Sequence, residues 1–585
     1  MKIAVISRAA GAATLAAAVA AACLCWWAGP IAAAQTETLA ITAIGFDGRV
    51  RMATWTPMWV EVRAPATGVD GTVTLAAASP TGTPVVQHTV SVRAAPGAVL
   101  RVFLPATLYD ARTPGALTLT EGGRSIATVA LPRIAPADEI IVVLSDEPLG
   151  LEAMSARGQR TEIAYVAPEN LPPIWQAYEG VRLVVVRNVD ERRLGDPQRR
   201  ALQQWIWSGG RLLVMPSGDD LRHFLGPTLR DLMPVTPASS RARSGAAVQP
   251  FTAKPGSESV DAAGTRAVRW RAGRGRVTVV GVDLADPALR GSPDDRRAWD
   301  AILADAPSPA VFELDATLPP QRPVPVRTQA LVGVLIVAYI VAARRLSRLT
   351  AGLRAPMIIS AVVMLAAATV IAARAAVFAR ADASGVVASA IAEGLPGTRY
   401  ALVAMSMRMV VSHTGDFVIG AREETLLRPV PPASVTVVYD GRTLLRSGAP
   451  GLRVTGLGIV PMDVTGTLVA RDDGGTLTVE NRAGVPIDPA WVYQAGRVQA
   501  VGPIGASAQI VIDGQRWLAR DRLQRTDPNH ALLVWAFSHL ETDAILKSIP
   551  TWLIGWVRSP ASSLTWEGRR EVTPHLVLVP LLASP

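Results

Sequence analysis

The sequence predicts a multidomain chain in which all-β regions flank an α/β domain and a two-helix transmembrane hairpin. Short β-type runs, punctuated by Gly, Pro and Asp, occupy the first and last thirds of the chain. Continuous apolar runs, typical of buried parallel strands, lie between residues 136 and 312. Two apolar segments flank a basic loop within residues 328–378. At 585 residues, the chain is also too long for one hydrophobic core.

These patterns set the expected domain boundaries. We expect a signal peptide at 1–34, a β-sandwich at 35–135, an α/β domain at 136–312 with an irregular insertion near 236–268, a linker at 313–327, a transmembrane hairpin at 328–378, and a β-rich exported domain at 379–585.

The N-terminus has the three parts of a secretory signal peptide. Lys2 and Arg8 precede a long apolar stretch, and small residues at 32–34 offer a cleavage site. An uncleaved anchor is the alternative, because the apolar stretch is nearly long enough to span a bilayer. Both cysteines, Cys23 and Cys25, lie in this stretch, so cleavage would leave a chain without thiols.

Two aromatic clusters are candidate binding surfaces. Trp55 and Trp59 belong to an expected strand of the sandwich, and Trp175 and Tyr178 precede an expected buried strand. Such rings either form a platform for stacking a ligand or pack in the core, and packing is the commoner role of buried aromatic residues.

The α/β domain is predicted from buried strands and one capped helix. The apolar runs 140–144, 163–166 and 181–186 are expected to be parallel strands. Asp196-Pro197 begins a helix whose apolar face recurs at helical spacing, and Gly209-Gly210 ends it before another buried strand at 211–215. A further helix is expected from Asn529 to about Ser548.

The central segments predict two passes through a membrane. The apolar runs begin at Ala330 and Pro356, and a short arginine-rich loop at 344–348 separates them. By the positive-inside rule, this loop lies in the cytoplasm and both flanking regions lie outside it. This predicts a bacterial inner-membrane protein with the lipid bilayer as a partner. A buried soluble helical hairpin is the alternative.

Composition and motifs narrow the function classes. The net charge of +10 comes from arginines scattered along the chain, without the clustered basic stripe and recognition motif of a nucleic-acid-binding protein, so we expect no nucleic-acid partner.

Ser145, Asp219 and His223 are candidates for hydrolytic catalysis. No nucleophile elbow surrounds Ser145 or Ser217, and Ser and Asp where a strand leads into a helix commonly cap the helix. None of the six histidines belongs to a metal-binding motif, so we expect no metal and no cofactor.

The order of several short motifs resembles a family of bacterial membrane proteins. The matching segments are Gly45 to Pro57, Trp175 to Val186, Gln198 to Leu212, Gly273 to Val277, Val479 to Ile487, and Ile554 to Trp556. The hairpin departs from the family's usual Gly-Pro-x-Asn-Tyr start. The resemblance implies a class I glutamine amidotransferase-like (flavodoxin-like) α/β domain, and AAA-type ATPases or von Willebrand A-domain proteins as partners. Function in this family is largely unassigned.

An amidotransferase needs a Cys nucleophile, which the expected α/β domain lacks. The leading hypothesis is therefore a non-enzymatic, inner-membrane-anchored envelope protein whose exported domains bind a protein partner or an envelope polymer. An exported hydrolase acting on envelope material, and an accessory subunit of a membrane transport or assembly complex, are the alternatives.

Overall fold

The computed structural model describes two long stretches of the chain. The first is residues 38–281, with gaps at 79–83, 113–114, 150, 152–160, 216–228, 238–250 and 263–264. The second is residues 385–581, with gaps at 411–416, 421–424, 431–434, 441–442, 448–451, 462–467, 473–475, 482–484, 514–516, 520–529, 559–562, 567–568 and 573–574. Five single positions between them, at 299, 302, 341, 344 and 345, are also described.

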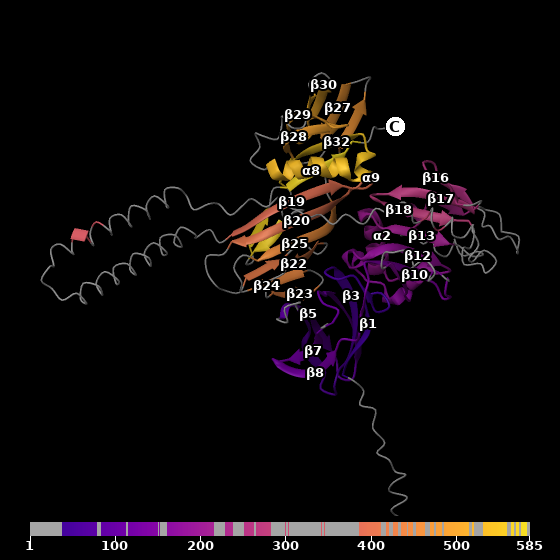
Figure 1. Ribbon diagram of the computed structural model, residues 1–585, viewed down its shortest axis with the longest axis vertical. Helices are drawn as coiled ribbons and strands as arrows, with labels where there is room; N and C mark the ends of the chain where they lie inside the picture. The colour runs from indigo at the N-terminus through magenta and orange to yellow at the C-terminus, as the bar shows by residue number, and fades with distance from the viewer. Residues whose placement is uncertain are drawn as a thin grey trace, which may run out of the picture.

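Two facing sheets form the N-terminal region at the base of the molecule (Figure 1). One sheet has the order β1-β3-β6, and the strands β5-β4-β7-β8 form part of the other. Met58 and Leu104 of the first sheet pack with Leu75 and Leu117 of the second in one core. The strands span Leu39–Ile44 (β1), Trp55–Arg63 (β3), Val69–Ala78 (β4), Pro84–Ala94 (β5), Val99–Thr107 (β6), Ala116–Glu121 (β7) and Arg124–Ala130 (β8).

The second sheet continues into the C-terminal part of the chain. Strand β23 (Val435–Tyr439) pairs in parallel with β5, and the sheet then continues through β24, β21, β33 and β34. Thr89 Oγ1 donates a hydrogen bond to the carbonyl oxygen of Val437 at 3.3 Å, across 348 positions of sequence. The two ends of the chain therefore share one sheet. The added strands are Phe417–Gly420 (β21), Thr443–Ser447 (β24), Ser563–Trp566 (β33) and Arg569–Val572 (β34).

A seven-stranded mixed sheet forms the magenta region of Figure 1, in the order β11-β10-β12-β13-β18-β17-β16. The first five strands run parallel, and β16–β17–β18 are antiparallel. Helix α2 (Asp196–Ser208) follows β12, and Gly195, not Asp196, is its N-cap. The strands span Glu139–Leu144 (β10), Thr161–Tyr165 (β11), Val181–Arg187 (β12), Arg211–Met215 (β13), Glu258–Ala262 (β16), Thr265–Ala272 (β17) and Gly275–Val280 (β18).

A nine-stranded sheet in the C-terminal region carries helices α8 (His530–Thr542) and α9 (Ala544–Lys547). Leu533, Ala536 and Phe537 of α8 pack in one core with Trp552 and Ile554 of the sheet. The strands, in sheet order, are Thr425–Pro429 (β22), Arg453–Pro461 (β25), Tyr400–Val410 (β20), Gly385–Gly394 (β19), His575–Pro580 (β35), Thr551–Val557 (β32), Ile487–Gln494 (β28), Arg497–Ile504 (β29) and Leu518–Ala519 (β31).

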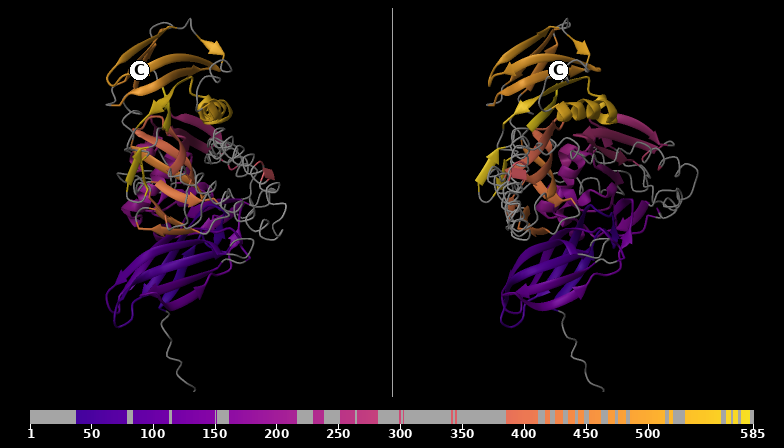
Figure 2. Two further views of the ribbon diagram at one scale, coloured as in Figure 1. Left: turned by 90° about the vertical axis from the view of Figure 1, so that its left-hand side faces the viewer. Right: turned by 60° about the vertical axis from the view of Figure 1, so that its left-hand side comes forward.

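Smaller sheets complete the described structure. A three-stranded sheet lies beside the nine-stranded sheet at the far end from the N-terminal region (Figure 2). Its strands, in order, are Leu468–Asp472 (β26), Thr476–Asn481 (β27) and Gln509–Asp513 (β30). Two pairs remain, Arg49–Val50 (β2) with Ala135–Pro136 (β9), and Val235–Pro237 (β14) with Phe251–Ala253 (β15).

The predicted fold class is wrong, because the described chain is mostly β. An amidotransferase-like domain alternates parallel strands with helices. Here the α-helices described from end to end are α2, α8 and α9, and 3-10 turns at Pro168–Asn170 and Trp175–Tyr178 lie between β11 and β12. The expected irregular insertion at 236–268 also contains strand residues, and its end pairs with the parallel sheet through β16 and β17. Local apolar runs identified the strands, but they did not reveal the antiparallel extension.

The predicted inner-membrane location and its two-span hairpin are also corrected. Within the part of the chain that the structure describes, no helix is long and apolar enough to cross a membrane. Residues 328–378 themselves lie outside the described residues, apart from Val341, Arg344 and Arg345. The expected signal peptide at 1–34 and linker at 313–327 lie outside them as well.

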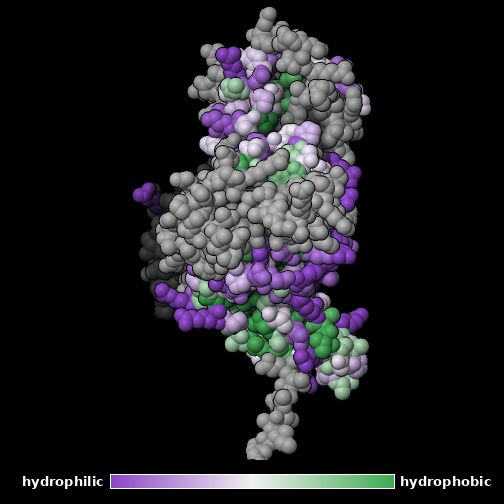
Figure 3. Space-filling model, turned by 90° about the vertical axis from the view of Figure 1, so that its right-hand side faces the viewer, coloured by the Kyte–Doolittle hydropathy of each residue, from purple (hydrophilic) through white to green (hydrophobic). Residues whose placement is uncertain are grey.

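The surface of the N-terminal region differs from that above it. In Figure 3, apolar side chains gather low on the molecule, over the N-terminal sheets, and hydrophilic side chains lie above them. Val99 and Ile126 are among the exposed large apolar residues of these sheets. Single exposed apolar side chains are normal on protein surfaces, so this distribution by itself assigns no site.

Candidate functional site

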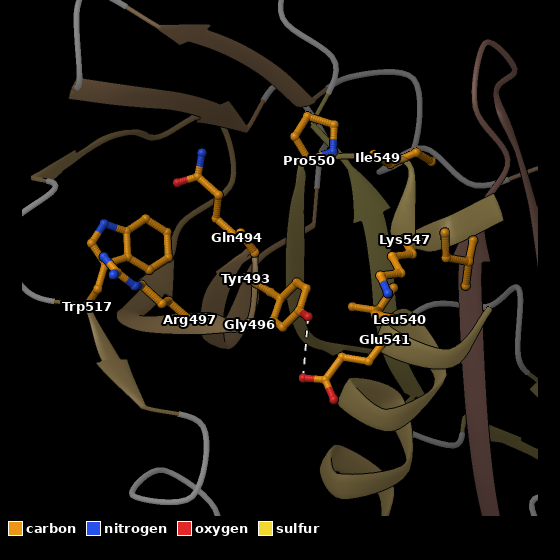
Figure 4. Close-up of a pocket in the computed structure, with 12 residues that line it drawn as sticks. Tyr493, Gln494, Gly496, Arg497, Trp517, Leu540, Glu541, Lys547, Ile549 and Pro550 are labelled. Carbon is orange, nitrogen blue, oxygen red and sulfur yellow. Dashed lines mark hydrogen bonds between the residues drawn. The ribbon is translucent and has the colours of Figure 1, made fainter. Parts of the chain in front are cut away.

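A large concave site lies between the β28–β29 hairpin and helices α8 and α9. Its volume is about 880 Å³, and Figure 4 shows the residues around it. The lining combines apolar, aromatic, amide and charged side chains. These residues are Tyr493, Gln494, Ala495, Gly496, Arg497, Trp517, Leu540, Glu541, Leu546, Lys547, Ile549 and Pro550.

One wall of this cleft is a tight hairpin turn. β28 ends at Gln494 and β29 begins at Arg497, and these two residues pair with each other, so only Ala495 and Gly496 form the loop. Their φ values are 47° and 81°. Positive φ at both loop residues is the requirement of a type I′ turn, whose twist matches that of the flanking strands. The turn therefore holds Gln494 and Arg497 at the rim of the cleft.

The opposite wall is the end of α8 together with α9. The apolar face of α8 anchors it to the sheet, and the rings of Phe537 and Tyr493 lie 5.9 Å apart. The chain breaks between the two helices at Asp543, whose Oδ1 accepts a hydrogen bond from the backbone N of Leu546 at 3.1 Å. This cap begins α9 and places Lys547 on the wall.

Some charged groups of the cleft have partners within the protein, and others do not. The Tyr493 hydroxyl donates to Glu541 Oε1 at 3.5 Å. Within the described part of the chain, the Arg497 guanidinium and the Lys547 ammonium have no hydrogen bond or ion pair. Figure 4 places Trp517 beside Arg497 on one side of the cleft, and Lys547 and Glu541 on the other. Two cations and an indole ring therefore remain available to a ligand.

Behind α8 lies a buried ionic cluster that joins it to the parallel sheet. Arg274, in the turn between β17 and β18, donates from one Nη to both oxygens of Glu393 at 2.9 and 2.7 Å. Its other Nη pairs with Asp543, and His539 Nε2 lies 3.2 Å from Glu393 Oε2. Because α8 and the residue after it contribute His539 and Asp543, one helix contacts both the ionic cluster and the cleft.

The catalytic candidates predicted from sequence do not form a site in the described structure. Ser145 follows β10, and its Oγ accepts a hydrogen bond from the backbone N of Glu147 at 3.2 Å, which is a local capping contact. Asp219 and His223 lie outside the described residues. Among the residues that were placed, no group of three or more His, Cys, Asp or Glu side chains is arranged to hold a metal ion.

Three of the four aromatic candidates are buried. Trp55 lies edge-on to His88, with their ring centroids 5.9 Å apart. Trp175 is also buried, and Tyr178 stacks on Trp205 at 5.5 Å. Burial raises the pKa of the Tyr178 hydroxyl above its usual range. These three rings pack in the core and offer no open platform.

Trp59 is more exposed, but its contacts are within the protein. The Arg101 guanidinium lies over its ring, 4.2 Å from the centroid. Its Nε1 donates to the carbonyl oxygen of Asn170 at 3.0 Å, and Phe103 lies 5.1 Å away. The ring thus joins the N-terminal sheets to the loop after β11.

Sequence reasoning missed Arg497, Trp517 and Lys547. Two local signals bear on them: Ala495-Gly496 is a compact turn between two β-type runs, and Lys547 is one of only three lysines in the chain. Neither signal shows that the hairpin meets a helix that begins 33 residues after Arg497.

Comparisons with known proteins leave the family unassigned. No family model and no curated protein matches the chain. A solved structure with partial similarity is the exo-beta-1,4-mannosidase Op5Man5 from Opitutaceae bacterium strain TAV5, at 18% identity and a TM-score of 0.21. The match covers 28% of this chain and 36% of the mannosidase, so this chain spans about a third of that enzyme.

Proposed function

We propose that this chain is a ligand-binding protein and that the cleft between the β28–β29 hairpin and α8–α9 is its binding site. The observation that carries the proposal is the unused chemistry of the cleft. Its volume of about 880 Å³ suits a sizeable ligand, and small-molecule sites commonly occupy roughly 300–1,000 Å³. Such sites combine apolar and aromatic walls with a few polar groups that orient the ligand, as this cleft does.

The lining favours binding over hydrolysis. Among the lining residues that the structure describes, Glu541 is the one carboxylate, whereas glycoside hydrolysis commonly uses a pair. Acyl transfer needs a nucleophile within reach of a base, and the described lining contains no Ser, Cys or His. Glu541 also accepts the Tyr493 hydroxyl, which orients its carboxylate within the cleft.

The test compares two tryptophan variants of the full chain. Trp517 lines the cleft, whereas Trp270, on β17, is not among the lining residues, and the ammonium of Lys254 lies 5.7 Å from the centroid of its ring. We expect a ligand found by screening polysaccharides and peptides to raise the unfolding temperature of the wild type and of W270A, but not of W517A. A ligand present at a hundred times its Kd stabilises the folded state by about 2.7 kcal/mol.

Equal stabilisation of both variants would place the binding site elsewhere. If chromatography over several hours showed that the protein releases a product from the ligand, that result would instead favour a hydrolase.

A further inference from the structure

The charges around the cleft indicate the ligand class. Arg497 and Lys547 are exposed and unpaired within the described structure, and Glu541 is the one acidic residue among the described lining residues. These residues together carry one net positive charge at neutral pH. Two cations on opposite sides of one cleft favour a ligand that carries more than one negative charge, because each cation attracts an anionic group.

The remaining groups suit a sugar better than a purely ionic ligand. The half-buried Trp517 ring lies beside Arg497 and offers an apolar face with a polar edge (Figure 4). Gln494 supplies an amide, and Glu541 supplies a carboxylate that accepts hydrogen bonds. A ligand that carries both carboxylates and hydroxyls matches this mixture, since its hydroxyls donate to Glu541 while its carboxylates meet the cations.

An extended peptide fits the same place less well. Peptides that bind beside sheets commonly pair with an open strand edge, where main-chain hydrogen bonds supply the affinity. The strand at this edge of the nine-stranded sheet is β31, which has two residues. It therefore offers a peptide little backbone to pair with.

We propose that the ligand is an acidic polysaccharide. One uronate carboxylate binds Arg497, with its sugar ring on Trp517, and the carboxylate of another uronate of the same polymer binds Lys547 on the other side of the cleft. This inference rests on the proposed function, because it specifies the occupant of the same cleft.

The experiment measures binding of the full-length protein to three polymers by calorimetry: alginate, which is a polyuronate, dextran, which is neutral, and polyglutamate. We expect alginate to bind most tightly. R497Q and K547Q should each weaken alginate binding about tenfold, which corresponds to about 1.4 kcal/mol, because each removes one charge-assisted contact with a carboxylate. Raising the salt concentration should weaken alginate binding by the wild type more than alginate binding by either variant.

Lys254 provides the matched control, because it is not among the residues that line the cleft and its ammonium donates to the carbonyl oxygen of Arg230 at 3.0 Å. K254Q should bind alginate like the wild type. Dextran binding that equals alginate binding and is lost in W517A would overturn the acidic ligand but keep the binding function. Tighter binding of polyglutamate would replace the polysaccharide with a peptide. The absence of Trp517-dependent binding to all three polymers would overturn the inference, and the wider screen would then decide the proposed function separately.

Discussion

Replacing Arg274 with Met should destabilise the protein by breaking a buried ion pair. The Arg274 side chain is 2% exposed and that of Glu393 is 0% exposed. The substitution removes both hydrogen bonds from Arg274 to the Glu393 carboxylate and leaves that group buried with His539 Nε2 at 3.2 Å. Breaking a buried pair by removing one partner costs about 3–5 kcal/mol, because the other charge stays away from water. We expect R274M to fall in this range.

The double variant separates the lost pair from the buried charge that it leaves behind. R274M/E393M replaces both charged groups with apolar side chains, and such replacements of whole pairs are often neutral or stabilising. We therefore expect it to be less destabilised than the sum of R274M and E393M by about 2 kcal/mol, within the usual coupling for residues in contact. Guanidinium unfolding followed by circular dichroism measures each free energy of unfolding.

An exposed ion pair of the same kind is the control. Arg93 and Asp70 pair at 2.7 Å with 83% and 68% of their side chains exposed. R93M should change the free energy of unfolding by less than about 1 kcal/mol, because surface pairs contribute little. Equal effects of R274M and R93M, or strict additivity in the double variant, would refute the reasoning.

Three further outcomes follow from buried groups and close contacts. Burial lowers the pKa of His88 to about 3, so the unfolded chain takes up a proton near pH 6.5 while the folded chain does not. The free energy of unfolding should be greatest above pH 6.5 and fall by about 2 kcal/mol between pH 7 and 5; H88Q should lose this fall in denaturant titrations. G275A should lower the unfolding temperature more than G256A does. A Cβ at position 275 would lie 2.0 Å from the carbonyl oxygen of Ile206, whereas a Cβ at position 256 has no atom within 4 Å, so that G256A adds only backbone strain. Tyr178 buries a hydroxyl that has no partner in the described structure, so Y178F should unfold at an equal or higher temperature, with a gain of at most about 1 kcal/mol; a loss above 2 kcal/mol would reveal an unrecognised partner.

Local patterns in the sequence determined many of the individual elements. The apolar run at 140–144 is strand β10 because its side chains are buried on both faces of a sheet. The helix expected at Asp196 is α2, whose buried residues recur at helical spacing as Ala201, Leu202, Trp205 and Ile206. The helix expected near 529–548 is α8 followed by α9, with the break at Asp543. Each of these patterns lies within a single short segment of the sequence.

Tertiary structure alone decided how these elements combine. Pairing of β23 with β5 merges two regions that sequence boundaries separate, since strand pairing depends on which edges meet in space. Arg274 and Glu393 are 119 positions apart, and no local pattern links them. The cleft likewise requires a hairpin, a short strand and two helix ends to converge. Local sequence patterns thus locate many of these strands and helices and confine the thiols to the N-terminus. The sheet order, the burial of Trp55, Trp175 and Tyr178, and the presence of Arg497 and Lys547 in one cleft depend on folding, because burial and long-range contact belong to the packed chain and not to any one segment.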